Sequence, residues 1–148
     1  VSICYESIYP DLSRAFAGRG ANLLMVITND AWFGTSSAAY QHYEMGVMRA
    51  IEDGRYLVRA ANTGITAAVD PYGQVLARAG MFDALSVAVD VRLLDGRTLY
   101  ARTGDVIAWL AIVWVANLYM SLFVRLRLDI KRERVEINVE EGKARRVG

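Results

Sequence analysis

The pattern of apolar and polar residues divides the chain into a mixed region and one long apolar run. In residues 37–53, apolar side chains recur at spacings of three and four, which predicts an amphipathic helix that Gly54 ends. A shorter helix is predicted at residues 10–17, because Pro10 suits a first helical turn. Residues 22–28 contain a continuous apolar run, Leu23 to Ile27, a pattern typical of a strand covered on both faces. Further strands are predicted at residues 1–3, 56–61, 65–70, 74–79 and 86–91, with a tight turn at Asp70-Pro71-Tyr72-Gly73.

The apolar run from Val106 to Val124 contains no charged residue. A bilayer core about 30 Å thick takes roughly 20 helical residues to cross, so this length predicts a transmembrane helix. Trp109, Trp114 and Tyr119 add aromatic rings of the kind that favour membrane interfaces. The alternative is a fully buried helix of a large soluble core, but such helices are rarely so evenly apolar. We therefore expect three parts: residues 1–105, a span at 106–124 and a charged tail at 125–148.

Charge is distributed unevenly around the predicted span. The tail, residues 125–148, holds eight of the 17 Lys and Arg residues and five of the 16 Asp and Glu residues. Positive charge beside a span stays in the cytoplasm, so we expect the tail inside and residues 1–105 outside the cytoplasm. The alternative, a solvated and partly disordered stretch that only anchors the helix end, gives the same topology.

Length and composition exclude several classes of protein. A chain of 148 residues suits one domain, and 54% hydrophobic against 22% charged residues excludes disorder for most of its length. The formal net charge of +1 leaves no basic excess for a nucleic-acid partner. Cys4 and His42 are the sole cysteine and histidine, which excludes an intramolecular disulfide and a zinc-finger type of metal site. Because the chain starts within an expected strand at Val1, we expect it to be the carboxyl-terminal piece of a longer protein.

Cys4 is the candidate nucleophile. It lies between the strand at residues 1–3 and the helix that Pro10 opens, a passage that can expose a thiol at a sheet edge. Backbone amides near a helix start favour a thiolate and can hold a developing oxyanion. The alternative is that Cys4 is a small, buried apolar residue without chemistry.

The segment Ile3-Cys4-Tyr5-Glu6-Ser7-Ile8-Tyr9-Pro10-Asp11 resembles the nucleophile segment of the nitrilase, or carbon–nitrogen hydrolase, superfamily. Within that superfamily, Cys-Tyr-Glu together with Trp-Phe-Gly, Gln41-His42 and a following membrane span is similar to the apolipoprotein N-acyltransferases. The resemblance extends over about residues 1–124, and the ordered set is specific although each motif alone is weak. The other matching segments are residues 20–28, Asn29-Asp30-Ala31-Trp32-Phe33-Gly34, Met48-Arg49-Ala50-Ile51-Glu52-Asp53-Gly54-Arg55, Asn62-Thr63-Gly64 and Asp70-Pro71-Tyr72-Gly73.

The resemblance implies a fold and a catalytic triad. The fold is α/β, part of an αββα four-layer sandwich, followed here by one transmembrane helix. The family triad is Glu-Lys-Cys, and Cys4 matches its cysteine. The general-base glutamate of the family lies upstream of the cysteine, and no lysine of this chain precedes Lys131 in the tail. The chain by itself is therefore predicted to be inactive. The resemblance implies no metal and no dissociable cofactor.

The implied reaction is acyl transfer at a bacterial inner membrane. The Cys4 thiolate attacks the ester of a phospholipid acyl donor and forms a thioester, which acylates the amino group of diacylglyceryl-cysteine at the amino terminus of an apolipoprotein. The backbone amide of Tyr5 is a candidate donor to the tetrahedral oxyanion. Residues 1–105 are expected to carry this chemistry on the periplasmic side, with the carboxyl terminus in the cytoplasm.

Several further residues have both a functional and a structural interpretation. Glu6 is expected to support the site rather than act as its base, or else to serve as a carboxylate at a helix start. Trp32, Phe33 and Gly34 are expected to bind substrate by covering a lipid tail, unless the two rings simply pack. A structural hydrogen bond is expected of His42 rather than catalysis. Ion pairs around the helix end are expected for Arg49, Glu52 and Arg55.

Two other functions stay open at this point. A soluble amidase or nitrilase would hydrolyse small carbon–nitrogen substrates with the same cysteine, and the apolar run at 106–124 argues against it. A membrane-anchored interaction module would leave Cys4 chemically inert.

Overall fold

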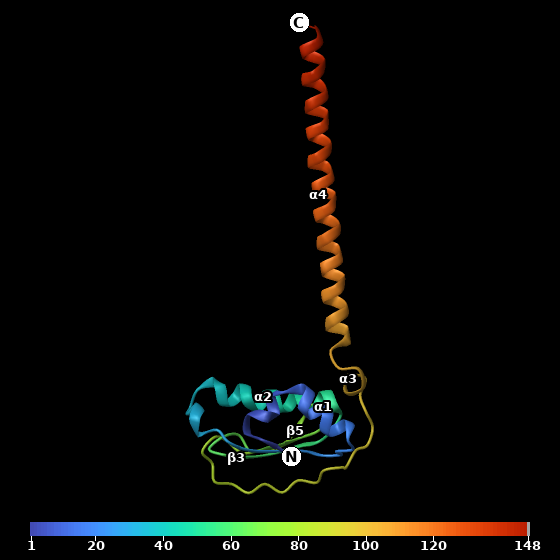
Figure 1. Cartoon of the computed structure of the whole chain (residues 1–148). Helices are drawn as coiled ribbons and strands as arrows, with labels where there is room; N and C mark the ends of the chain where they lie inside the picture. The colour runs from blue at the N-terminus through green and yellow to red at the C-terminus, as the bar shows by residue number, and fades with distance from the viewer. Residues whose placement is uncertain (148) are drawn as a thin grey trace. The chain divides into compact units, whose positions relative to one another are not determined.

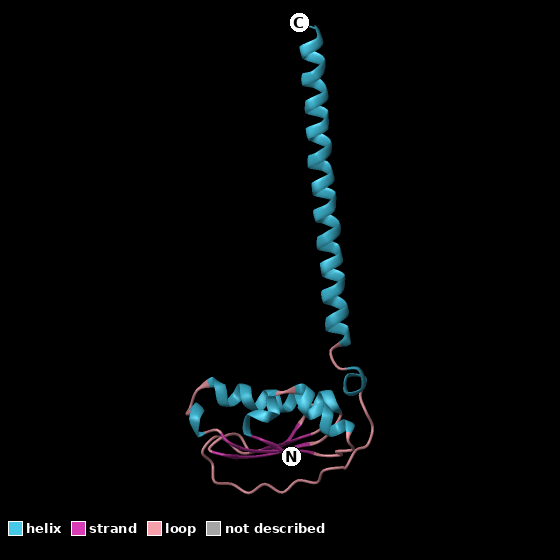
Figure 2. Ribbon diagram, viewed as in Figure 1, coloured by secondary structure: helices cyan, strands magenta, loops and turns pink. Residues whose placement is uncertain are grey.

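A computed structural model describes the backbone of residues 1–147 and the side chains of residues 1–132 and 134. The chain consists of two units, Val1–Gly104 and Asp105–Gly148. The first unit is a mixed sheet with helices, and the second is one long helix (Figures 1 and 2).

The sheet of the first unit has five strands in the order β1-β2-β3-β4-β5. Strands β1, β2 and β3 are parallel, whereas β4 and β5 join as antiparallel neighbours. Five of the predicted strands are confirmed with small changes at their ends. Their bounds are Ser2–Ile3 for β1, Leu24–Asn29 for β2, Leu57–Asn62 for β3, Ala67–Val69 for β4 and Val75–Arg78 for β5.

Helices α1 (Pro10–Gly18) and α2 (Ser37–Asp53) lie on the same face of the sheet, as Figure 1 shows. Both were predicted from the sequence. Pro10 occupies the first turn of α1. Gly54 ends α2 in the left-handed conformation, with φ of 63°, where its amide donates to Ala50 and Ile51. Shorter helices at Cys4–Ile8 (η1), Ala31–Phe33 (η2) and Leu99–Thr103 (α3) were not predicted.

The hydrophobic core lies between the sheet and α2. Every second residue of β2 faces this core, because side chains alternate between the two faces of a strand. Burial of one valine, leucine or isoleucine side chain contributes about 1.5–3 kcal/mol to the stability of the folded state. The core residues are Leu24, Val26, Leu57, Ile65, Ala67 and Val69 from the sheet region and Tyr43, Val47 and Ala50 from α2.

The opposite face of the sheet corrects two predictions. Met25 and Ile27 are 41% and 56% exposed, so β2 is not covered on both faces within the part of the chain that the structure describes. Residues 86–91 form no strand, because no described strand pairs with them. They belong instead to the extended segment that runs along this face in Figure 1. A cavity of about 600 Å³ separates the segment from the sheet, lined by Ile27, Val58, Leu85, Val87 and other residues.

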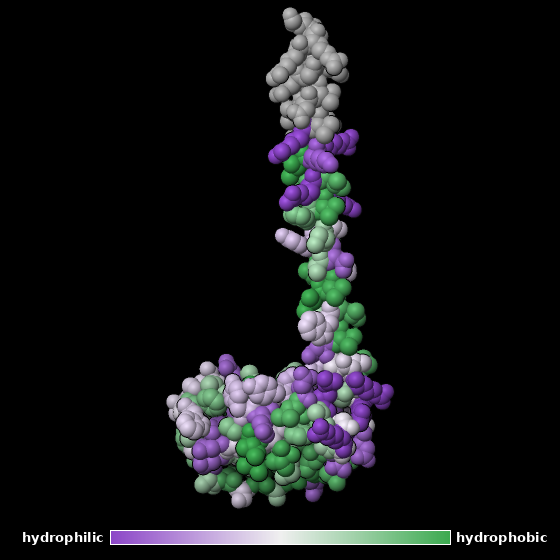
Figure 3. All heavy atoms as spheres, in the orientation of Figure 1, coloured by the Kyte–Doolittle hydropathy of each residue, from purple (hydrophilic) through white to green (hydrophobic). Residues whose placement is uncertain are grey.

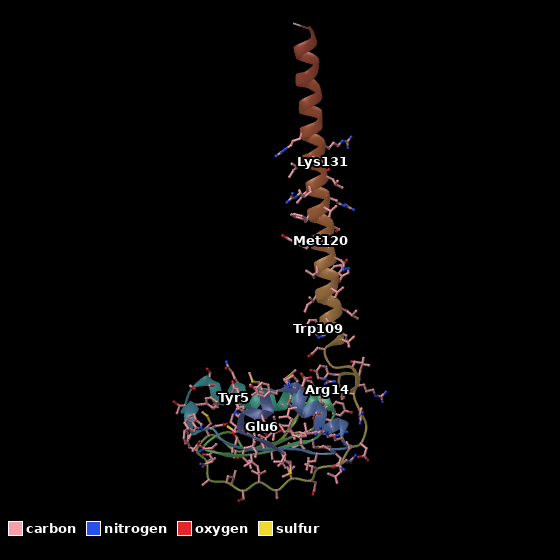
Figure 4. The ribbon with its side chains drawn as sticks, in the orientation of Figure 1. Tyr5, Glu6, Arg14, Trp109, Met120 and Lys131 are labelled. Atoms are coloured by element: carbon pink, nitrogen blue, oxygen red, sulfur yellow. The ribbon has the colours of Figure 1, made fainter. Side chains whose placement is uncertain are left out.

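The second unit is helix α4 (Val106–Val147). One stretch of it, Val106–Arg132, is long and apolar enough to cross a membrane, and none of that stretch is buried within the protein. Figure 3 shows apolar side chains gathered along the first part of α4 and charged ones beyond, and Figure 4 labels Trp109, Met120 and Lys131 along its length. The backbone stays helical through Val147, where the sequence suggested a partly disordered tail. The side chains of residues 133 and 135–148 of that tail lie outside the described ones.

Candidate active site

Cys4 lies where β1 ends and η1 begins, and it is partly exposed. Its backbone adopts a φ of 51°, in the left-handed region that residues other than glycine rarely occupy. Such a conformation costs about 1–3 kcal/mol and persists only when surrounding contacts hold it. The contacts of residues 3–7, here called the Cys4 turn, therefore matter to any chemistry of the Cys4 thiol.

Two hydrogen bonds within the turn hold the backbone on either side of Cys4. The Ile3 amide donates to Glu6 Oε2 at 2.8 Å, and the Ser7 hydroxyl donates to the Cys4 carbonyl oxygen at 3.1 Å. Figure 4 shows Tyr5 and Glu6 on this turn, and both side chains are exposed. Glu6 thus acts on the backbone that precedes the thiol.

His42 reaches the same turn from α2. Its side chain is almost fully buried, with Nε2 3.2 Å from the Cys4 carbonyl oxygen and 3.1 Å from Ser7 Oγ. Its other nitrogen, Nδ1, lies 3.0 Å from Asp30 Oδ1. The structural hydrogen bond predicted for His42 is therefore confirmed, and one of its partners is the backbone of the candidate nucleophile.

A buried ion pair lies behind His42. Arg59 Nη2 of β3 donates to Asp30 Oδ2 at 2.6 Å, and both side chains are fully buried. The Thr28 hydroxyl also donates to Asp30 Oδ1 at 2.9 Å. Breaking such a pair by removing one partner typically costs about 3–5 kcal/mol, because the other charge stays buried. The pair thus gives His42 a rigid support.

The aromatic residues predicted to bind substrate occupy different positions. The ring centroid of Phe33 lies 5.7 Å from that of His42. The ring centroid of Tyr5, a residue of η1, lies 5.9 Å from that of His42. Trp32 is instead 86% exposed. Gly34 follows with φ of 53° and ψ of −134°, a conformation that suits glycine. The Trp32-Phe33-Gly34 segment therefore contacts His42 through Phe33.

The charged residues at the end of α2 form contacts that were only partly predicted. Arg49 pairs with Glu52 at 2.8 Å, as expected, and also donates to the Ile8 carbonyl at the end of η1. Arg55 corrects the prediction, because its guanidinium donates to the carbonyls of Ala21 and Gly96 rather than to a carboxylate. A 1% exposed guanidinium needs acceptors, and these backbone carbonyls supply them.

Asp53, the last residue of α2, is a second buried carboxylate. The Ser13 hydroxyl of α1 donates to Asp53 Oδ2 at 2.5 Å. Burial raises the pKa of Asp53, and this effect outweighs the opposing influence of the Ser13 hydrogen bond and of Arg49, Arg55 and Arg14. This contact joins α1 to the end of α2.

Sequence reasoning missed the parts of the site that depend on tertiary contact. Ser7, Asp30 and Arg59 were not singled out, although each is at most 2% exposed and each belongs to the network around His42. A signal existed for Arg59, because a lone charged residue stood inside a predicted strand, residues 56–61. Such a residue is almost never fully buried unless it has a partner.

Residues 1–96 match the model of the carbon-nitrogen hydrolase family. The chain belongs to this family, and the matched residues include the Cys4 turn described above.

Curated relatives show which members of the family the chain is similar to. The chain is 47% identical over 125 residues to an apolipoprotein N-acyltransferase of Geobacter metallireducens. The aligned residues cover 84% of this chain and 24% of that relative. It is 40% identical over 122 residues to an apolipoprotein N-acyltransferase of Thermotoga maritima, covering 82% of this chain and 24% of the relative. The chain thus spans about a quarter of the length of these relatives.

A solved structure resembles part of the chain. It is a mutant of the Nesterenkonia AN1 amidase from the nitrilase superfamily, 29% identical, with a TM-score of 0.44. The match covers 53% of this chain and 32% of the amidase chain.

Proposed function

We propose that the protein takes part in the transfer of a fatty acyl chain from a phospholipid to the amino terminus of an apolipoprotein, through a thioester on Cys4. The observation that carries the proposal is the Cys4 turn itself: a partly exposed thiol on a backbone of φ 51°, with the Ile3 amide bonded to Glu6 and the Cys4 carbonyl oxygen in contact with Ser7 and His42. The names of the relatives support the choice of reaction.

The reaction has two halves. Cys4 Sγ attacks the carbonyl carbon of the lipid ester, the bond to the glycerol oxygen breaks, and the thiol proton passes to that oxygen to give a lysophospholipid. The α-amine of the diacylglyceryl-cysteine then attacks the thioester, the carbon–sulfur bond breaks, and the amine proton returns to the sulfur. Covalent catalysis thereby divides one difficult transfer into two easier steps.

Residues around Cys4 have proposed roles in these steps. The Tyr5 amide donates to the oxyanion of each tetrahedral intermediate. Glu6 supports the turn by accepting the Ile3 amide. Phe33, packed against His42, and Gly34 are proposed to line the lipid site, and the exposed Trp32 is proposed to meet the lipid tail.

The proton carrier and the cationic stabiliser are proposed to come from outside these residues. No lysine precedes Lys131, and the carboxylate nearest in sequence to Cys4, Glu6, is already bonded to the Ile3 amide. We therefore expect the chain of 148 residues to show no turnover by itself.

Helix α4 supports a membrane location. We propose that it crosses the bacterial inner membrane, with residues 1–104 on the periplasmic side and the basic end in the cytoplasm, following the excess of Lys and Arg after the apolar stretch. We expect the protein to resist extraction by alkaline carbonate. We also expect a protease to reach residues 1–104 from the periplasmic side alone.

Intact-mass spectrometry tests the acyl transfer. The polypeptide that contains these residues, in its native membrane, is incubated with phospholipid of one known acyl chain. The expected result is a mass increase of that acyl group on Cys4, absent in Cys4→Ala and discharged by a diacylglyceryl-cysteine peptide. A folded protein whose Cys4 reacts with iodoacetamide but never carries the acyl group contradicts the proposal.

Membership of the carbon-nitrogen hydrolase family favours one second candidate, the hydrolysis of small amides by the same thiol. Release of ammonia from short-chain amides, together with an absence of the lipid adduct, supports this alternative. Both activities are expected to disappear in Cys4→Ala, so the substrate panel and not the variant distinguishes them.

A further inference from the structure

Ser7, His42 and Asp30 form a row with the connectivity of a serine-hydrolase triad. Ser7 Oγ lies 3.1 Å from His42 Nε2, and His42 Nδ1 lies 3.0 Å from Asp30 Oδ1. Ser7 is only 2% exposed, however, and its hydroxyl donates to the Cys4 carbonyl. The row therefore ends on the backbone of Cys4 and not on a substrate.

The hydrogen-bonding groups around His42 indicate which ring nitrogens carry hydrogen. Asp30 is an acceptor at Nδ1, and the Cys4 carbonyl oxygen is an acceptor at Nε2. Because the Ser7 hydrogen is directed to the Cys4 carbonyl, Ser7 Oγ presents a lone pair to Nε2 as well. Arg59 Nη2, 3.1 Å from Nδ1, is the one donor among these ring contacts of the described residues. A hydrogen on Nε2 satisfies both acceptors that face it.

The Cys4 carbonyl and the Tyr5 amide are the two ends of one planar peptide unit. In a trans peptide the C=O and N–H bonds point in opposite directions, so an anchor on the oxygen fixes the direction of the N–H. Cys4 has a φ of 51°, and no cis peptide bond occurs among the residues that the structure describes. His42 and Ser7 hold the oxygen on the buried side, which directs the Tyr5 N–H away from that side.

We propose that His42 is a positioning residue: its Nε2–H donates to the Cys4 carbonyl, fixes the Cys4–Tyr5 peptide plane, and thereby presents the Tyr5 amide to the oxyanion. Asp30, supported by Arg59 and Thr28, holds the imidazole ring in the orientation this requires. The catalytic consequence rests on the proposed acyl transfer, whereas the fixed peptide plane does not. His42 itself does not touch the substrate.

A matched pair of variants separates the two nitrogens of His42. In His42→Gln the side-chain amide nitrogen reaches the place of Nε2, and in His42→Asn it reaches that of Nδ1. Loss of one oxyanion donor typically lowers kcat about 10²–10³-fold. We expect kcat of the acyl transfer to fall by about that factor in His42→Asn, with KM unchanged, and to be restored for the most part in His42→Gln. Equal loss in both variants, or a change in KM alone, overturns the proposal.

A measurement without substrate tests the peptide plane directly. The chain contains one cysteine and one histidine, so labelling with carbonyl-13C cysteine and ring-15N histidine gives one signal for Cys4 and one imidazole. We expect a hydrogen-bonded Nε2–H, and a Cys4 carbonyl resonance that differs between wild type and His42→Asn. The charged or ionisable side chains that face the ring are Asp30, Arg59 and Tyr5, so each spectrum is repeated in Tyr5→Phe.

Ser7→Ala provides a second variant that removes one hydroxyl from the same carbonyl. It is expected to shift the Cys4 carbonyl resonance in the same direction as His42→Asn. A Cys4 carbonyl signal that is the same in wild type, Ser7→Ala and His42→Asn overturns the positioning role. A protein that has the expected spectra but never forms an acyl adduct refutes the proposed acyl transfer and leaves the peptide-plane inference standing.

Discussion

Gly64 lies directly against the side chain of Asp30. A Cβ atom added at Gly64 would stand 2.8 Å from both Cβ and Cγ of Asp30, closer than such atoms approach in proteins. Asp30 cannot yield easily, because Arg59 and His42 hold both of its oxygens. The absence of a side chain at Gly64 is therefore a condition for the buried ion pair and for the support of the Cys4 turn.

Gly64→Ala is expected to displace Asp30 and weaken its contacts with Arg59 and His42. The loss of a buried pair suggests a destabilisation of about 3 kcal/mol or more. Thermal unfolding in detergent measures it. The matched control is Gly18→Ala, since a Cβ at Gly18 in helix α1 meets nothing within 4 Å. Equal unfolding temperatures for the two variants would show that the Asp30 contact carries no energy.

Asp53 predicts a pH dependence of stability. Because burial raises the pKa of Asp53 above its ordinary value of 3.8, the folded protein binds the Asp53 proton more tightly than the unfolded chain does. The resulting stabilisation is fully present below the unfolded pKa and is lost as the pH rises through the folded pKa. Asp53→Asn keeps an oxygen for the Ser13 hydroxyl but cannot ionise.

The stability of Asp53→Asn relative to wild type is therefore expected to increase as the pH rises from 4 to 7. Urea unfolding of the two proteins at several pH values measures the difference. Ser13→Ala serves as the companion variant, because it removes the hydrogen bond that favours the charged form and should steepen the dependence. A difference that stays constant across this range would mean that Asp53 has the same pKa in both states.

Variants of Glu6 can show whether its role depends on the hydrogen bond that it accepts or on its negative charge. If its role is to accept the Ile3 amide, Glu6→Gln retains a side-chain oxygen for that bond and should keep most of the stability of the turn. Glu6→Ala loses the acceptor, and a hydrogen bond to a charged group contributes about 1.5–3 kcal/mol. The alkylation rate of Cys4 by iodoacetamide reports the state of the turn. Behaviour of Glu6→Gln like that of Glu6→Ala would assign the role to the negative charge instead.

The helices and most strands were predictable because their signals are local. The spacing of apolar residues in 37–53 and the glycine that follows determine where α2 begins and ends, almost independently of the rest of the chain. The turn at Asp70 was predictable for the same reason, since its carboxylate accepts the amides of Tyr72 and Gln74 within four residues. These elements place Cys4 at the end of β1 and His42 on α2.

The network around Cys4 was not predictable, because it joins residues far apart in the sequence. Arg59 and Asp30 are 29 positions apart, and Ser7 and His42 are 35 apart, so no local pattern relates them. The error at residues 86–91 has a similar cause: the apolar composition suits a strand, but a strand needs a neighbour, and the composition does not report one. Cys4 was a candidate from its place between a strand and a helix, and the family resemblance then matched it to the catalytic cysteine.

Trp32 and Phe33 are adjacent in sequence but are expected to respond differently to removal. Phe33 packs its ring against His42, with ring centroids 5.7 Å apart, so Phe33→Ala should lower the stability of the first unit and disturb the Cys4 turn. Trp32 is 86% exposed, so Trp32→Ala removes little buried area and should leave the unfolding temperature nearly unchanged. If Trp32 meets the lipid tail, its loss raises KM for long-chain phospholipid donors and has little effect on short-chain ones. Trp32→Phe retains an apolar ring and should behave as wild type. If Trp32→Ala and wild type have equal kinetics with both chain lengths, Trp32 does not bind the lipid tail, and Phe33 is the one aromatic ring of this segment that serves the site.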